Sequence, residues 1–366
     1  MHSELLLIVV VVVALAFDFT NGFHDTANVV ASAISTRALA PRTAIALAAI
    51  LNFVGAFASL KVAATIATGI INASQVTETI AFAGLLGAIA WNLLTWMFGL
   101  PSSSSHALIG GVIGAMLAAV GGSGVNVSGV LDKVVIPAFV APISALVIAA
   151  ILIALIYRVF GRRRPGPVTR GFRLGEVVTS SVLAFAHGTN DAQKTMGVIT
   201  LALVAHGSLN PDNVQVPSWV VICSATAIGL GTYAGGWRII RTVGSRIIKM
   251  DPAQGFTAQG AGGFVILFSS HLGYPLSSTH VITGGVMGAG AGKRLSAVRW
   301  GVAGSIAVAW VITLPIAALF GAAAYAIASA FGTGAVGPLV MTLVAAGALV
   351  GALAARRRRW AEAASA

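Results

Sequence analysis

The chain has 366 residues, of which 57% are hydrophobic and only 9% are charged, and its mean hydropathy is +0.92. About one quarter of the residues of a soluble globular domain are charged, so this composition excludes that class and predicts a membrane protein. The net charge of +12 would suggest a nucleic-acid partner in a soluble protein. Here the basic residues flank long apolar segments, as topology signals do, so no nucleic-acid partner is expected.

Apolar segments recur along the whole chain, and several are long enough to cross a bilayer, for example 43–70, 134–160 and 305–328. The first apolar segment, 5–17, resembles the core of a signal peptide. However, no lysine or arginine precedes it and no small-residue cleavage site follows it, so we expect it to remain as the first half of a membrane helix. The sequence therefore predicts an all-α polytopic membrane protein.

A polar motif interrupts the first apolar segment and is repeated in the second half of the chain. Residues 19–25 read FTNGFHD and residues 185–191 read FAHGTND, with Phe, Gly and Asp at matching positions. A glycine flanked by polar residues can unwind a membrane helix and free its backbone groups for a ligand. We therefore expect a broken helix at Gly22 and another at Gly188. The acid of each motif would then lie at the start of the resumed half-helix, whose N-terminal amides favour an anion.

A second repeated motif is rich in serine. Residues 101–106 read PSSSSH and residues 275–280 read PLSSTH. Hydroxyl donors beside the N-terminus of a following helix favour a compact tetrahedral oxyanion. The segments 82–120 and 255–292 can each be drawn as two crossings or as a re-entrant hairpin with the serines at its tip. Proline and serine interrupt a helix, which is tolerated where the backbone lines a site rather than lipid, so the composition favours the hairpin.

The duplication predicts two halves of one fold, and the basic residues set their orientation. Arginine and lysine cluster in alternate connections, which places the N-terminus outside and the C-terminus in the cytoplasm. An odd number of crossings in each half makes the second half inverted. The predicted parts are a first inverted repeat (1–160), an arginine-rich cytoplasmic linker (161–173), a second inverted repeat (174–332), and a final membrane helix with a basic cytoplasmic tail (333–366).

With these motifs the chain resembles the inorganic phosphate transporter (PiT) family of secondary carriers, of the bacterial low-affinity type. Both family signatures are present, at 21–28 and 187–194, together with both serine-rich tips. The resemblance covers essentially the whole chain. It implies two inverted repeats, each with a broken helix and a re-entrant hairpin, with phosphate held between the tips and the broken helices. It also implies a homodimer in the plasma (inner) membrane.

The resemblance carries roles over to individual residues. Asp25, Asn28 and Asp191 correspond to the acids and amide that coordinate the coupling ion or the substrate, and His24 and His187 are the neighbours placed to take up a proton. The expected phosphate ligands are hydroxyl, amide and ammonium groups, namely Ser103, Ser104, Ser105, Ser277, Ser278, Thr279, Asn190 and Lys194. No metal site, cofactor or enzymatic activity is expected, because the His and Asp residues lack metal-site spacing and no nucleotide-binding loop is present.

Two positions depart from the pattern of sodium-coupled members, in which both signatures carry Asn-Asp-x-x-Asn. His24 precedes the first acid, and Lys194 stands where the second pattern has asparagine. A fixed ammonium repels a cation and can neutralise Asp191, so we expect phosphate:proton symport, with phosphate moving alone or as a metal complex. The alternatives are a sodium/phosphate symporter, a sulfate permease of the same family and, from a different class, an anion channel.

Overall fold

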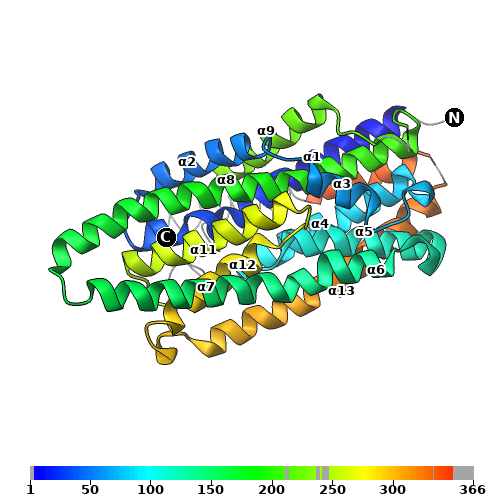
Figure 1. Ribbon diagram of the computed structural model, residues 1–366. Helices are drawn as coiled ribbons and strands as arrows, with labels where there is room; N and C mark the ends of the chain where they lie inside the picture. The colour runs from blue at the N-terminus through cyan, green and yellow to red at the C-terminus, as the bar shows by residue number, and fades with distance from the viewer. Residues whose placement is uncertain (1–3, 211–213, 236–239, 241–246, 333, 349–366) are drawn as a thin grey trace, which may run out of the picture.

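The computed structural model describes residues 4–210, 214–235, 240, 247–332 and 334–348, and the regular elements in these ranges are helices. The helices lie roughly along one direction in an elongated bundle (Figure 1). Their bounds are α1 (Glu4–Ser35), α2 (Pro41–Gly55), α3 (Lys61–Thr68), α4 (Glu78–Phe98), α5 (Ser104–Val120), α6 (Val127–Val130), α7 (Ile136–Phe160), α8 (Pro165–His206), α9 (Ser218–Ala234), α11 (Pro252–His271), α12 (Ser278–Ala291) and α13 (Trp300–Ala330). A short apolar helix, Val336–Ala348, follows. The basic tail predicted within 333–366 lies outside the described residues.

Five of the described helices are long and apolar enough to cross a bilayer: Glu4–Ser35, Glu78–Phe98, Ser104–Gly124, Val127–Phe160 and Trp300–Ala330. Large apolar side chains on α7 and α13 point away from the bundle, such as Ile143, which is 58% exposed, and Val311, which is 67% exposed. Such faces are unfavourable in water and natural in lipid. The prediction of an all-α, multi-pass membrane protein is therefore confirmed.

Helices from the two halves of the chain pack on one another reciprocally. α1 packs on α9, while α2 packs on α8. Likewise, α13 packs on α4 and α5, while α7 packs on α11 and α12. Each half therefore supplies a helix that covers the helix pair of the other half, and neither half buries its apolar faces alone.

Both serine-rich motifs lie in turns between packed helices. The chain turns between α4 and α5 at 99–103, and between α11 and α12 at 272–277. Ser103 and Ser277 are the N-caps of α5 and α12, since their hydroxyls accept from the backbone amides of His106 (3.1 Å) and His280 (3.3 Å). A serine in this position satisfies an amide that has no partner within the helix, which explains why both helices begin there.

The predicted helix breaks at Gly22 and Gly188 are wrong. α1 runs through Gly22 for 32 residues and α8 runs through Gly188 for 42 residues, so both motif acids lie within continuous helices. The glycines instead allow another helix to approach. A Cβ atom at Gly22 would lie 2.4 Å from the carbonyl oxygen of Ile228 in α9, and one at Gly188 would lie 2.1 Å from that of Asn52 in α2. Glycine without a side chain serves close packing in a membrane helix as readily as a break, and here it serves packing.

The connection between α7 and α8 is shorter than expected. The chain turns over 161–164 and α8 begins at Pro165, so helix takes up most of the predicted linker 161–173. Proline suits the first turn of a helix because its missing N–H would have no partner there. The α7–α8 turn forms one end of the bundle (Figure 1).

Replacing Gly188 by alanine should destabilise the protein, because the added methyl group meets the backbone of α2. Overpacking of this kind typically costs about 1–3 kcal/mol. The midpoint of thermal unfolding of the detergent-solubilised protein measures the effect. Gly171→Ala is the matched control in the same helix, where the added Cβ has no atom within 4 Å, and it should be neutral or slightly stabilising. Equal midpoints for the two variants would contradict the packing role.

Candidate functional site

The two serine-rich turns meet the motif-bearing stretches of α1 and α8 in one buried group of polar side chains. We call this group the polar core, and it consists of His24, Asp25, Asn28, Ser104, Ser105, His187, Asp191, Lys194, Ser278 and Thr279. None of these residues is more than 2% exposed. Charged and polar groups inside a membrane protein are unfavourable unless they are paired, so such a concentration marks a functional site.

Lys194 of α8 is fully buried, and its ammonium group joins three parts of the fold. Nζ donates to Oδ1 of Asp191 at 2.5 Å. It also donates to Oγ of Ser105 in the first turn at 2.5 Å, and to the carbonyl oxygen of Leu276 in the second turn at 2.8 Å. An ammonium group has three donors, so Lys194 is fully satisfied. Breaking a buried ion pair by removing one partner costs about 3–5 kcal/mol, so Lys194 and Asp191 depend on each other.

Asp191 also collects donors from outside α8. Its Oδ2 accepts from the Ser278 hydroxyl at 3.1 Å and lies 3.1 Å from Nε2 of His187. Nδ1 of His187 in turn lies 3.2 Å from the amide oxygen of Asn52 in α2. Asp191 therefore connects α8 to the second serine turn directly, and to α2 through His187.

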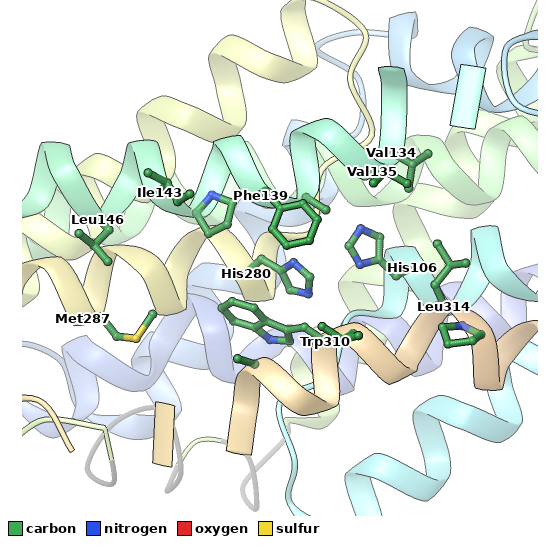
Figure 2. A pocket seen from close by; sticks show the side chains of 15 residues that line it. His106, Val134, Val135, Phe139, Ile143, Leu146, His280, Met287, Trp310 and Leu314 are labelled. Carbon is green, nitrogen blue, oxygen red and sulfur yellow. The ribbon is translucent and has the colours of Figure 1, made fainter. Parts of the chain in front are cut away.

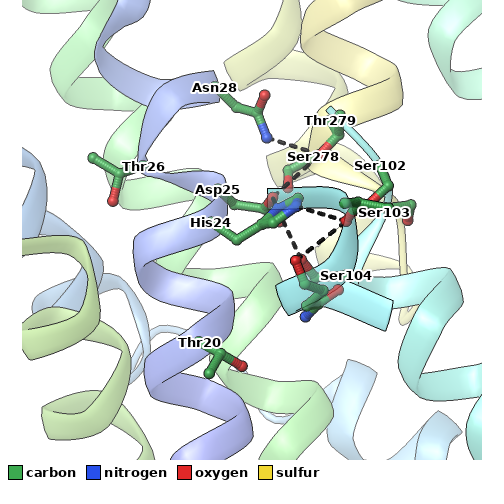
Figure 3. A network of polar contacts seen from close by, with 12 residues as sticks. Thr20, His24, Asp25, Thr26, Asn28, Ser102, Ser103, Ser104, Ser278 and Thr279 are labelled. Atoms are coloured by element: carbon green, nitrogen blue, oxygen red, sulfur yellow. Dashed lines mark hydrogen bonds and ion pairs between the residues drawn. The ribbon is translucent and has the colours of Figure 1, made fainter. Parts of the chain in front are cut away.

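Asp25 and its neighbours on α1 contact both turns (Figure 3). Oδ1 of Asp25 lies 2.7 Å from Nδ1 of His24 and accepts from the Thr279 hydroxyl at 3.3 Å. Nδ2 of Asn28 donates to the same Thr279 hydroxyl at 2.8 Å. Nδ1 of His24 also lies 3.5 Å from Oγ of Ser104. The α1 motif thus reaches the first turn through His24 and the second turn through Asp25 and Asn28.

Three of the residues expected to bind phosphate have supporting contacts instead. Ser103 and Ser277 cap the helices that follow them. Nδ2 of Asn190 donates to Oγ of Ser270 at 2.8 Å and to the carbonyl oxygen of Tyr274 at 3.3 Å, which holds the end of α11 against α8. The hydroxyls within the polar core, on the two turns, are therefore the groups best placed to donate to an anion.

The two histidines that follow the serines line an apolar cavity (Figure 2). The ring centroids of His106 and His280 lie 4.7 Å apart, and the His280 ring stacks on the indole of Trp310 at 4.1 Å. The cavity has a volume of ≈ 440 Å³ and is lined by α7 and α13, with none of the hydroxyl or carboxylate groups of the polar core in its wall. These contacts favour the structural role of the two histidines over a role as anion donors.

Three polar side chains that support the polar core were not predicted from the sequence. Oε1 of Gln193 accepts from two amides in the first turn of α3, at 2.9 and 3.2 Å. Oγ1 of Thr95 in α4 lies 3.3 Å from Nε2 of His24, and Asn52 contacts His187 as described above. The signal that could have found Thr95 and Asn52 is a polar residue in an otherwise apolar segment.

The polar core also has the composition of a cation site. One ligand atom each of Asp25, His187 and Asp191 lies within 4.8 Å of the others, close enough for the three to hold a small cation. Lys194 Nζ lies 2.5 Å from one of these acids, however, and a fixed positive charge repels a second cation at such distances. Chemically, the site combines hydroxyl donors, one buried positive charge and two acids that can exchange protons.

Comparison with known sequences identifies the family. The sequence model of a family described as "Phosphate transporter family" matches residues 21–321 of the chain. The chain belongs to this family.

Individual relatives agree with the assignment to phosphate transporters. A protein of Mycobacterium tuberculosis (strain ATCC 25618 / H37Rv), described as a "Probable low-affinity inorganic phosphate transporter", is 54% identical over 320 residues, which cover 87% of this chain and 77% of that protein. A protein of Bacillus subtilis (strain 168) with the same description is 45% identical over 323 residues, 88% of this chain and 96% of that protein. A solved structure titled "The sodium-dependent phosphate transporter" superposes with a TM-score of 0.75 at 26% identity, covering 87% of this chain and 98% of that chain. These relatives are transporters, in keeping with the expectation that the chain is not an enzyme.

Removing the hydroxyl of Ser104 or Ser278 should weaken phosphate uptake by this transporter. The loss of one donor to a bound anion costs about 1.5–3 kcal/mol, which corresponds to a loss of affinity of about tenfold to a hundredfold. Uptake of radiolabelled phosphate into proteoliposomes measures the effect of Ser104→Ala and Ser278→Ala. Ser123→Ala and Ser128→Ala, at exposed positions, are the controls and should transport normally. Equal, small effects at all four positions would refute the assignment.

The two motif acids should each be essential for transport. Asp25→Asn removes the charge that accepts from His24 and Thr279, and Asp191→Asn leaves the ammonium of Lys194 without its carboxylate partner. We expect uptake to fall to background in both variants. Size-exclusion profiles must show that each variant is folded, because an unpaired buried charge also destabilises the protein. Asp132→Asn, at an exposed acid, is the control, and normal transport by folded Asp25→Asn and Asp191→Asn proteins would exclude the site.

Proposed function

We propose that the protein takes up inorganic phosphate by secondary active transport driven by protons, with Asp25, His24 and His187 as the titratable groups that the sequence suggests. The observation that carries the proposal is the buried ammonium of Lys194, which contacts both serine turns and Asp191. A positive charge between two sets of hydroxyl donors favours a compact oxyanion. The same charge takes the electrostatic role that a sodium ion would have beside Asp191.

Phosphate would bind between the two turns. Ser278 donates to Asp191 and Thr279 donates to Asp25, so each carboxylate accepts from a hydroxyl that could donate equally to a phosphate oxygen. Phosphate in this position would lie close to two acids of its own sign, which is unfavourable while both are ionised. Binding a proton near the site removes that repulsion. Proton binding and phosphate binding then favour each other, as symport requires.

The proposal includes the architecture expected from the sequence. The halves 1–160 and 174–332 would be inverted repeats with their serine turns at the tips of re-entrant hairpins, joined by the linker 161–173 and followed by 333–366. Support comes from the reciprocal packing of α1 and α2 on α9 and α8. The N-terminus would lie outside and the C-terminus in the cytoplasm, and the protein would be a homodimer in the plasma membrane.

Sodium-coupled phosphate transport is the second candidate. It is supported by the superposition on a solved structure titled "The sodium-dependent phosphate transporter" and by the cluster of Asp25, His187 and Asp191. Against it stands Lys194, whose ammonium already lies at hydrogen-bonding distance from Asp191. Sulfate transport, movement of a metal-phosphate complex and an anion channel remain alternatives that substrate competition and uphill accumulation distinguish.

Proton coupling predicts that uptake into proteoliposomes responds to an imposed pH gradient, acidic outside, and is indifferent to replacing Na⁺ by K⁺ or choline. Sulfate in excess should not compete. Strict dependence on sodium at constant pH would overturn the proposal.

The variant Lys194→Asn restores the Asn-Asp-x-x-Asn pattern of the sodium-coupled signature. It should lose pH-driven uptake by at least about tenfold, since a buried charge partner of Asp191 is removed. Any uptake that remains should be stimulated by sodium, because the repulsion of a cation is gone. Unchanged pH-driven uptake in Lys194→Asn would show that the ammonium does not determine coupling.

A further inference from the structure

One buried acid lies outside the polar core. Asp18 of α1 is 0% exposed, and neither of its carboxylate oxygens has a hydrogen-bond partner among the described residues. By contrast, Asp25, Asp191 and the buried Glu176 each accept from neighbouring hydroxyls. Asp18 precedes Asp25 by seven residues, which places it on the same face of α1 at about 10 Å along the helix.

The surroundings of Asp18 are polar but unpaired. The side chains of Asn21, one turn further along α1, and of Thr195, on α8, lie beside its carboxyl group. The amide oxygen of Asn21 and the hydroxyl of Thr195 also have no hydrogen-bond partner. A buried carboxylate without partners is unfavourable, whereas a neutral carboxyl group can donate its proton to an oxygen such as that of Asn21. The environment therefore suits a carboxyl group that holds a proton in this conformation.

The charge state of Asp18 is linked to the polar core. The titratable groups that act on it are Asp191 and Lys194, both on α8. An ionised Asp18 would compete with Asp191 for the ammonium of Lys194, while a neutral Asp18 leaves that ammonium to Asp191 and to an incoming anion. Protonation of Asp18 therefore favours anion binding, which is the sign that symport requires.

No other titratable group on the elements around α1 is among those that act on Asp18. On α1 itself, His24 and Asp25 lie about two turns away. The titratable residues on the other helices that pack on α1 are Arg42, Glu78, His106, Cys223, Tyr233, His271 and His280. Asp191 and Lys194 are accordingly the partners through which a change at Asp18 reaches the substrate.

Asp18 also lies between the polar core and the apolar end of α1. The preceding buried side chains of α1, including Val10, Val13 and Phe17, belong to the main apolar cluster of the bundle. They close off the carboxyl group on the side that the proposed topology assigns to the outside. In the second half of the chain Ala184 occupies the corresponding position, so this acid is not duplicated, unlike the acids of the polar core.

We propose that Asp18 is the residue that binds the coupling proton. The inference rests on proton-coupled transport and names Asp18, in place of Asp25, His24 or His187, as the group that gains and loses the proton. In the step, a proton from water on the outer side forms an O–H bond with the Asp18 carboxylate before or together with phosphate binding. After phosphate has left toward the cytoplasm, the O–H bond breaks and the same proton passes to water on that side.

The test separates proton coupling from phosphate movement, using wild-type protein and the variants D18N, D18E and D132N in proteoliposomes. The first measurement is accumulation of radiolabelled phosphate driven by an inward proton gradient, in which one pH unit can drive about a tenfold accumulation for each proton carried. The second is exchange of labelled for unlabelled phosphate at equal pH, which needs no net movement of protons. The third is the infrared carbonyl-stretch band of a protonated carboxyl group in the purified protein.

We expect D18N to lose the driven accumulation while it still exchanges phosphate, and to lose one carboxyl band from the infrared spectrum. D18E keeps a carboxyl group and should restore driven accumulation, and D132N, at an exposed acid, should match the wild type in all three measurements. Driven accumulation by D18N at the wild-type level would overturn the inference. Loss of exchange together with accumulation in both D18N and D18E would overturn it too, because it would assign Asp18 to structure or substrate binding.

The wild-type protein decides the underlying function independently. If wild-type accumulation ignores the pH gradient and follows a sodium gradient, proton coupling fails, and the role of Asp18 as a proton carrier fails with it. If wild-type accumulation follows the pH gradient and D18N behaves like wild type, only the inference about Asp18 fails. The two failures therefore leave different records.

Discussion

The buried ammonium of Lys194 is the contact on which the rest of the polar core depends. A positive charge in a medium of low polarity needs acceptors on every donor, and Lys194 finds them on α8 and on both serine turns. The two turns come from opposite halves of the chain, yet each presents an oxygen atom to the same nitrogen. A movement of either turn away from α8 would leave one donor without a partner, so the positions of the two turns are linked through a single group.

The polar core is duplicated in shape but not in charge. In both signatures the third residue after the acid reaches a serine turn: Asn28 follows Asp25 and donates to Thr279, and Lys194 follows Asp191 and donates to Ser105. One of these side chains is neutral and the other is charged. The second acid therefore has a permanent counter-charge and the first has a histidine. Two acids in related surroundings are thus given different electrostatic environments, which is a common way to assign them different tasks.

The sequence predicts well which stretches of the chain meet, because polar residues inside apolar segments have few tolerable places and the motifs occur twice. Asp25, Asp191 and the serine turns are brought together as this reasoning requires. It fails at Gly22 and Gly188, because glycine can open a helix or let another helix approach, and only the neighbouring α9 and α2 backbones decide between the two. It also cannot find the contact of Lys194 with Leu276, since a backbone carbonyl has no signature in a sequence. The partnerless state of Asp18 is likewise a property of its neighbours alone.

The reciprocal packing of the two halves has a consequence for how the protein is made. α4 and α5 are completed by α13, which is synthesised only after almost the whole second half of the chain. Because chains are made and inserted from the N-terminus, the α4–α5 pair must wait in the bilayer with one face uncovered. That face is built from small residues, and a Cβ at Gly114 would lie 1.9 Å from the carbonyl oxygen of Ala318 in α13. Such a face presents no unsatisfied polar group to lipid, so the order of insertion need not follow the order of packing.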